Sequence, residues 1–135
     1  RRDYDANQSI RRLSDIQGLL GVMELAELDR RNSHRRANAL RLLDRVKGTH
    51  GIKLPVFDAS CENSFNAVAI RTSWSKELAH RLRKSGFDTR TDYMEWFGAE
   101  KDFEEGVLYL PNHPGMSSDD IDALAQAVRS AMHPV

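Results

Sequence analysis

The sequence predicts a small α+β domain in which helices flank a three-stranded sheet and a long helix comes first. Its 135 residues have the length of one domain, and a hydrophobic content of 40% is enough for one core. Apolar residues recur with helical spacing near both ends of the chain, and short apolar runs bounded by Gly or Pro lie between them. With no internal repeat and no long linker, we expect one domain over residues 1–135.

A long N-terminal helix, or two helices in series, is predicted over residues 14–47. Ser14 followed by Gln17 is typical of a capping box, and Gly48 and Gly51 indicate where the helical segment ends. The polar stretch at 29–36 cannot face a core, so we expect it to lie in solvent or against another subunit. The two stripes on either side of this stretch have the spacing i, i+3, i+4, i+7 and consist of Ile16, Leu19, Leu20 and Met23, then Ala39, Leu42, Leu43 and Val46.

Shorter elements are predicted after this helical segment. We expect strands at residues 65–71, 87–90 and 107–110, a helix at 75–85 and a final helix from Ser117 onward. Ser117 and Asp120 have the spacing of an N-terminal cap, and residues 91–106 read as a loop with some helical turn. Because three strands cannot bury both faces of their sheet, we expect a neighbouring domain or subunit to cover the remainder.

The composition excludes several classes of protein. Formal net charge is zero, which does not favour a general binder of polyanions. No window of 18 apolar residues predicts a membrane span, and the single Cys61 excludes a disulfide within the chain. The chain starts at Arg1 without an apolar leader, so we expect a processed polypeptide or a piece of a longer one, located in the cytoplasm.

Charge is unevenly distributed along the chain. Residues 1–90 carry 18 basic and 11 acidic side chains, whereas residues 91–135 carry 2 basic and 9 acidic ones. This asymmetry indicates either attraction within the fold or between subunits, or simply a solvated acidic surface, which we favour.

No motif for catalysis by this chain alone is present. The sequence lacks a G-x-G-x-x-G phosphate loop and a G-x-S-x-G nucleophile elbow, and its five histidines are not clustered at the spacing of metal ligands. The arginines of residues 30–36 have the spacing to contact phosphates. Because carboxylates lie nearby, we favour a solvated helix face and expect no nucleic-acid partner. The aromatic residues of the acidic segment either line a ligand pocket or seal that segment onto the core; these are Tyr93, Trp96, Phe97 and Phe103.

Three segments together resemble one enzyme family, the DegT/DnrJ/StrS sugar aminotransferases. Residues 12–21 resemble the family motif N-x-R-M-S-D-x-Q-A-A-L-G, and residues 25–36 continue it in order. Residues 78–93 resemble its L-x-x-x-G-I-x-T-R-x-H-Y stretch, and residues 110–117 resemble the L-P-x-x-P-x-M-S/T run before its last helix. The resemblance spans nearly all 135 residues and lies in the C-terminal part of these enzymes.

This resemblance implies the C-terminal small domain of a pyridoxal-phosphate enzyme with the fold of type I aminotransferases. Such enzymes transfer an amino group, usually from glutamate, to a keto-sugar nucleotide, and the cofactor serves as the electron sink. In the family, the lysine that holds the cofactor lies in a large N-terminal domain that this chain lacks. We therefore expect no catalysis and no cofactor binding from this chain alone, and we expect the large domain or a partner subunit, in a homodimer, to complete the site.

Two residues of the chain match family positions at the substrate site. Arg12 matches the arginine that reaches the partner subunit's active site and binds a carboxylate or the substrate, and a guanidinium fork suits such a contact. Tyr93 matches a tyrosine that lines the substrate pocket. Two other positions depart from the family, because Ile10 replaces an asparagine that touches the cofactor phosphate and Asp92 replaces a histidine.

These two departures keep a second hypothesis open. The alternative is a stand-alone interaction or regulatory module that kept the fold of the small domain and lost its chemistry. Arg12 itself also has a simpler interpretation, as a cation that flanks the first helix. The sequence does not identify the sugar, the amino donor or the pathway.

Overall fold

The structure is a computed structural model that describes residues 14–58, 60–91 and 106–132. The chain divides into two compact units, with the boundary between Arg30 and Arg31. The predicted site residues Arg12 and Tyr93 lie outside the described residues, as do Ile10 and Asp92.

The predicted N-terminal helical segment consists of two helices in series, α1 (Asp15–Ala26) and α2 (Leu28–Val46), rather than one long helix. The Ser14 backbone N–H donates to Gln17 Oε1 at 2.9 Å, and Ser14 Oγ accepts from the Gln17 backbone N–H at 3.3 Å. This confirms the predicted capping box. At the other end, Glu27 caps α1 and its backbone N–H donates to the carbonyls of Glu24 and Leu25. No residue of α1 is buried, so its apolar stripe is on the surface.

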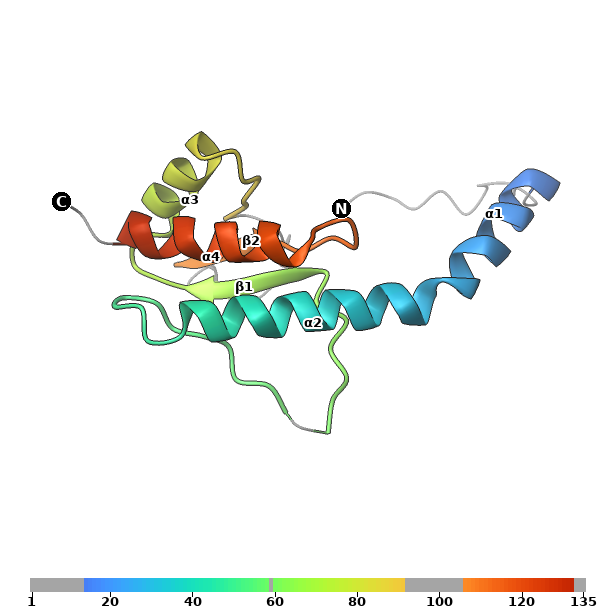
Figure 1. The fold of residues 1–135 in the computed structure, drawn as a ribbon, viewed down its shortest axis with the longest axis horizontal. Helices are drawn as coiled ribbons and strands as arrows, with labels where there is room; N and C mark the ends of the chain where they lie inside the picture. The colour runs from blue at the N-terminus through green and yellow to red at the C-terminus, as the bar shows by residue number, and fades with distance from the viewer. Residues whose placement is uncertain (1–13, 59, 92–105, 133–135) are drawn as a thin grey trace, which may run out of the picture. The chain divides into compact units, whose positions relative to one another are not determined.

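The second unit contains the hydrophobic core and most of the described elements. After α2, these are β1 (Ala67–Arg71), α3 (Ser75–Lys84), β2 (Val107–Pro111) and α4 (Ser118–Met132), as Figure 1 shows. The second predicted apolar stripe, on α2, is buried in this core, as are most of the apolar residues of α3 and α4. The helices predicted near residues 75–85 and from Ser117 onward are therefore confirmed.

The two strands pair antiparallel and turn one face towards the helices. Val68 pairs with Leu110 and Ile70 pairs with Leu108, and all four side chains are buried in the same cluster as the helix residues. The alternate pair, Ala69 and Tyr109, is only half-buried. Because side chains alternate between the faces of a sheet, the helices cover one face, as the sequence predicts.

The sheet has two strands in the part of the chain that the structure describes, not the three that the sequence predicts. Of the expected strand at 87–90, only Arg90 pairs, through an isolated bridge to Tyr109. In antiparallel register the next hydrogen-bonded pair would place Asp88 opposite Pro111, which has no N–H to donate. The carbonyl of Thr89, which faces away from β2 in this register, accepts from the Arg83 guanidinium at 2.6 and 3.0 Å.

Caps define the ends of the later helices. Ser117 Oγ accepts from the Asp120 N–H at 3.2 Å, and the Ser117 N–H donates to the Asp120 carboxylate at 2.8 Å. This reciprocal pair confirms the predicted cap of α4. The bonds that the Ser117 backbone N–H and hydroxyl donate to the Asp120 carboxylate lower the pKa of Asp120. Gly48, with φ at +77°, follows the end of α2 and confirms the predicted stop.

Candidate functional site

The described lysines do not form a cofactor site. Lys47, Lys53, Lys76 and Lys84 are all exposed at the surface. A lysine that forms a Schiff base with pyridoxal phosphate needs a shielded pocket that lowers its pKa and positions the cofactor. These residues therefore do not fit pyridoxal phosphate, and we derive no chemical step through it.

The arginines at residues 30–36 are partly paired with carboxylates. Arg30 Nε donates to Glu27 at 2.6 Å, and Arg36 forms an ion pair with Glu62 at 3.2 Å. Arg31 and Arg35 are half-buried. Because Arg30 and Arg36 each hold a carboxylate, the positive charge that this stretch presents is partly neutralised.

A buried polar junction lies at the end of β2. The Asn112 side-chain nitrogen donates to the carbonyl of Phe65 at 2.7 Å and to the carbonyl of Arg35 at 3.0 Å. Asn112 is 3% exposed, so these two bonds satisfy carbonyls that water does not reach. Phe65 has φ at +48°, and its N–H donates to Asn63 Oδ1 at 2.8 Å, which holds this turn in place.

Two polar atoms of this junction lack hydrogen-bond partners. They are Arg35 Nε and Asn112 Oδ1, the buried side-chain atoms within the described ranges for which none is found. The residue types at 112–115, Asn-His-Pro-Gly between a strand end and a capped helix, predict only a turn. Its spacing to Arg35 and Phe65 gives no signal of this junction.

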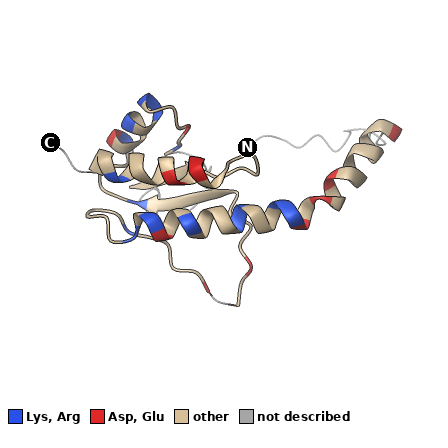
Figure 2. Cartoon of the chain, viewed as in Figure 1, with Lys and Arg blue, Asp and Glu red and all other residues tan. Residues whose placement is uncertain are grey.

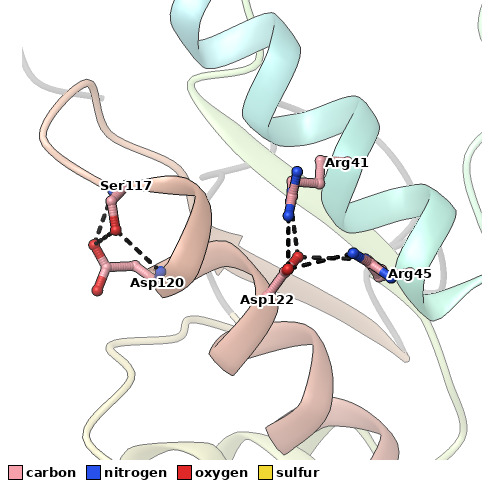
Figure 3. A network of polar contacts seen from close by, with 5 residues as sticks. All are labelled: Arg41, Arg45, Ser117, Asp120 and Asp122. Atoms are coloured by element: carbon pink, nitrogen blue, oxygen red, sulfur yellow. Dashed lines mark hydrogen bonds and ion pairs between the residues drawn. The ribbon is translucent and has the colours of Figure 1, made fainter.

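A second polar network joins α2 to α4 (Figure 3). Arg41 donates to both carboxylate oxygens of Asp122, at 2.7 and 2.8 Å, and Arg45 adds a bond at 3.3 Å. The hydrogen bonds from Arg41 are the main cause of the lowered pKa of Asp122, and Asp122 in turn raises the pKa of Arg41. A carboxylate held in this way is a poor proton acceptor, so the network acts as a clamp between helices and not as a general base.

Beside this clamp lies an open hollow of about 530 Å³ between α2 and α4. It contains two cations and one carboxylate, together with neutral polar groups, but no cysteine, histidine or lysine. The hollow therefore lacks a nucleophile activated by a neighbouring base. Its lining consists of Arg45, Asp122, Ala125, Gln126, Arg129 and Ser130.

The clamp also accounts for part of the charge asymmetry of the sequence. Figure 2 shows basic residues (blue) along α2 and α3 and acidic residues (red) in the first turns of α4. Arg41 and Arg45 belong to the basic part of the sequence, and Asp122 belongs to the acidic part. In this clamp, the basic and the acidic parts of the sequence attract each other within the fold.

Neither a cluster of metal ligands nor a membrane-spanning helix is found in the described part of the chain. Among the described residues, no three His, Cys, Asp or Glu side chains are grouped so that they could hold a metal ion. In the same ranges, no helix combines the length and hydropathy needed to cross a bilayer.

Comparisons with known proteins agree on one family. The DegT/DnrJ/EryC1/StrS aminotransferase family matches residues 8–129. No curated relative matches the chain. Among solved structures, DesV of S. venezuelae, determined in complex with a ketimine intermediate, is 25% identical with a TM-score of 0.77. The aminotransferase TlmJ of Streptoalloteichus hindustanus is 23% identical with a TM-score of 0.77, and shares the fold.

The match covers most of this chain but less than half of the solved ones. The aligned residues make up 99% of this chain and 43% of DesV. For TlmJ these shares are 92% and 38%. Helicobacter pylori PseC, an aminotransferase involved in the biosynthesis of pseudoaminic acid, is 18% identical with a TM-score of 0.77, and the shares are 90% and 38%. The chain thus corresponds to the smaller part of each of these structures.

Proposed function

Because this chain belongs to the DegT/DnrJ/EryC1/StrS aminotransferase family, we propose that it is the C-terminal small domain of a sugar aminotransferase. The activity of the whole enzyme is then transfer of an amino group, with glutamate as the donor, to a keto-sugar nucleotide. The observation that carries this proposal is the family match over residues 8–129, joined to the 43% share of DesV that the chain represents.

In this proposal the chain has no catalytic activity by itself. Pyridoxal phosphate, when bound in the whole enzyme, supplies the electron sink for amino transfer. The exposed positions of the four described lysines support its attachment outside this chain. The small domain would instead complete the substrate pocket and bury surface in a cytoplasmic homodimer.

Arg12 and Tyr93 are the proposed contacts with the substrate. Arg12 is two residues before the cap of α1 in the sequence, and its guanidinium would take a carboxylate through two parallel hydrogen bonds. Tyr93 would line the pocket with its ring and donate through its hydroxyl. Support for both comes from the family motifs that these positions match in the sequence.

Replacement of Arg12 tests this assignment in the whole polypeptide that carries residues 1–135. We expect Arg12→Ala to lower kcat/KM for amino transfer at least about 10-fold, because loss of a charge-assisted hydrogen bond costs about 1.5–3 kcal/mol. Arg11→Ala removes the neighbouring cation, which the motif does not match, and serves as the control. Equal kinetics for Arg12→Ala and the unmodified enzyme would remove Arg12 from the site.

A stand-alone interaction module is the second candidate function. Ile10 and Asp92 favour this second candidate. Ile10 replaces the family asparagine that contacts the cofactor phosphate, and Asp92 replaces the family histidine that precedes the pocket tyrosine. The two candidates differ in one assay of the native polypeptide with pyridoxal phosphate, glutamate and a nucleotide-linked keto-sugar. Formation of the amino sugar supports the aminotransferase, and its absence from a correctly folded polypeptide supports the module.

A further inference from the structure

Helix α1 carries a larger exposed apolar surface than any other helix in the described part of the chain. Six of its large apolar side chains are more than half exposed, and none of its residues is buried. Burying one such side chain contributes about 1.5–3 kcal/mol, so this surface is costly to leave in water. The six side chains are Ile16, Leu19, Leu20, Val22, Met23 and Leu25, and we call them the α1 surface.

The α1 surface extends around more than half of the helix. At 100° per residue, its six side chains span an arc of roughly 220°, which only Asp15, in the first turn, interrupts with a charge. Outside this arc lie Gln17, Gly21 and Glu24. An amphipathic helix that rests on a single flat surface needs a narrower stripe than this. The width of the arc therefore indicates a helix enclosed from more than one side.

Two observations indicate which molecule covers this surface. The match to DesV includes 99% of this chain, and therefore α1, while 57% of DesV has no counterpart here. A second copy of α1 is a poorer occupant, because the only charged side chains on α1 are the acidic Asp15 and Glu24. Pairing of two copies through this arc would bring the Asp15 carboxylate, which lies within the arc, against a helix that has no basic side chain to pair with it, and would cover only one side of each helix.

We propose that the α1 surface docks into the cofactor-bearing domain that makes up the remaining part of the whole enzyme. This inference rests on the proposed function and goes beyond it, because it assigns the contact to one helix and to six side chains. Helix α1 would then anchor Arg12, which is two residues before the cap at Ser14 in the sequence.

Hydrogen exchange of the α1 amides tests this docking in two samples, the isolated 135-residue chain and the whole native polypeptide. A helix of 12 residues is marginal by itself, so we expect fast exchange over Asp15–Ala26 in the isolated chain. In the whole polypeptide we expect exchange to slow about 100-fold or more. Equal exchange in the two samples would contradict the docking, as would a monomeric isolated chain with α1 already protected.

A pair of leucine variants makes the test specific to the α1 surface. Leu19→Glu places a charge within the arc, and Leu40→Glu places one on α2 at a leucine of similar exposure, 51% against 62%. Both variants of the isolated chain should keep its melting temperature, because neither leucine is buried. In the whole polypeptide, Leu19→Glu should abolish the slow exchange of α1, and Leu40→Glu should retain it. The same result for both variants overturns the proposal.

The outcomes separate this inference from the proposed function. An active aminotransferase in which α1 exchanges as fast as in the isolated chain contradicts the docking and leaves the function standing. An inactive polypeptide in which the α1 amides are protected supports the docking and contradicts the proposed function. An isolated chain that dimerises and protects α1 identifies a second copy as the occupant and overturns the proposal.

Discussion

At the scale of single residues, Asn112 contributes through its amide nitrogen, which joins three segments that are distant in sequence. It donates to carbonyls of α2 and of the turn before β1 while it sits at the end of β2. Both acceptors are backbone oxygens, so the side chain at this position must provide a donor. An aspartate has nearly the same shape but, when ionised, only accepts.

We therefore expect Asn112→Asp to reduce the free energy of unfolding by about 2 kcal/mol or more, because a buried carbonyl left without its donor costs about 1–3 kcal/mol. The matched control is Asn63→Asp, since Asn63 uses its side-chain oxygen to accept from the Phe65 N–H. Aspartate retains that acceptor, and this variant should be nearly neutral. Urea unfolding of the two variants measures the difference, and equal losses would show that the donor does not matter.

The Arg41–Asp122 clamp predicts a dependence of stability on pH. Because the pKa of Asp122 is lower in the folded chain than in the unfolded one, the clamp stabilises the fold above the unfolded value, about 3.9. This contribution is lost as pH falls through the folded pKa. We expect Asp122→Asn to be less stable than the parent at pH 7, and the gap to narrow as pH falls below about 4. A gap that is independent of pH in urea titrations would contradict the clamp.

At the scale of elements, the sequence predicts where the helices lie better than it predicts which of their apolar faces are buried. Capping residues and apolar spacing lie within one segment, so the ends and periodicity of α1 and α4 follow from local chemistry. Burial does not follow in the same way. The stripe on α1 and the stripe on α2 have the same spacing, yet the first is exposed and the second is in the core. Whether an apolar stripe is buried depends on residues that are distant in the sequence, or on another domain or subunit.

The missing third strand has a similar cause. Residues 87–90 have a composition compatible with a strand, but their pairing depends on the neighbour in β2, where Pro111 cannot donate. This constraint appears only once the register of the strands is known. The Asn112 junction also depends on register, since its acceptors are 77 and 47 residues away in the chain.

Two glycines with the same backbone conformation allow strain to be separated from crowding. Gly106 and Gly86 have φ at +90° and +89°. A Cβ at Gly106 would lie 2.9 Å from the carbonyl oxygen of Thr72, whereas a Cβ at Gly86 would have nothing within 4 Å. Either alanine must adopt a left-handed conformation, at a cost of about 1–2 kcal/mol. We expect Gly106→Ala to lose about 1 kcal/mol more, measured by thermal unfolding. Equal losses would mean that β2 shifts without cost.

At the scale of the whole molecule, the fold corresponds to less than half of each solved aminotransferase structure that it resembles. The core, the clamp and the caps account for a stable small domain, and none of them is arranged for chemistry. The candidate site depends on Arg12 and Tyr93, which lie outside the described residues. The family motif indicates these two positions, whereas composition and periodicity cannot, because substrate contacts have no repeating pattern along a chain.

The central claim is that this chain is the small domain of a larger aminotransferase, and the mass of the intact native polypeptide tests it most directly. An antibody raised against residues 1–135 would identify the species in its native source for mass measurement. Since the chain represents 35–43% of the solved structures that it resembles, we predict a polypeptide more than twice as heavy as 15.4 kDa. A native species near 15.4 kDa would contradict this account and would identify a stand-alone module instead.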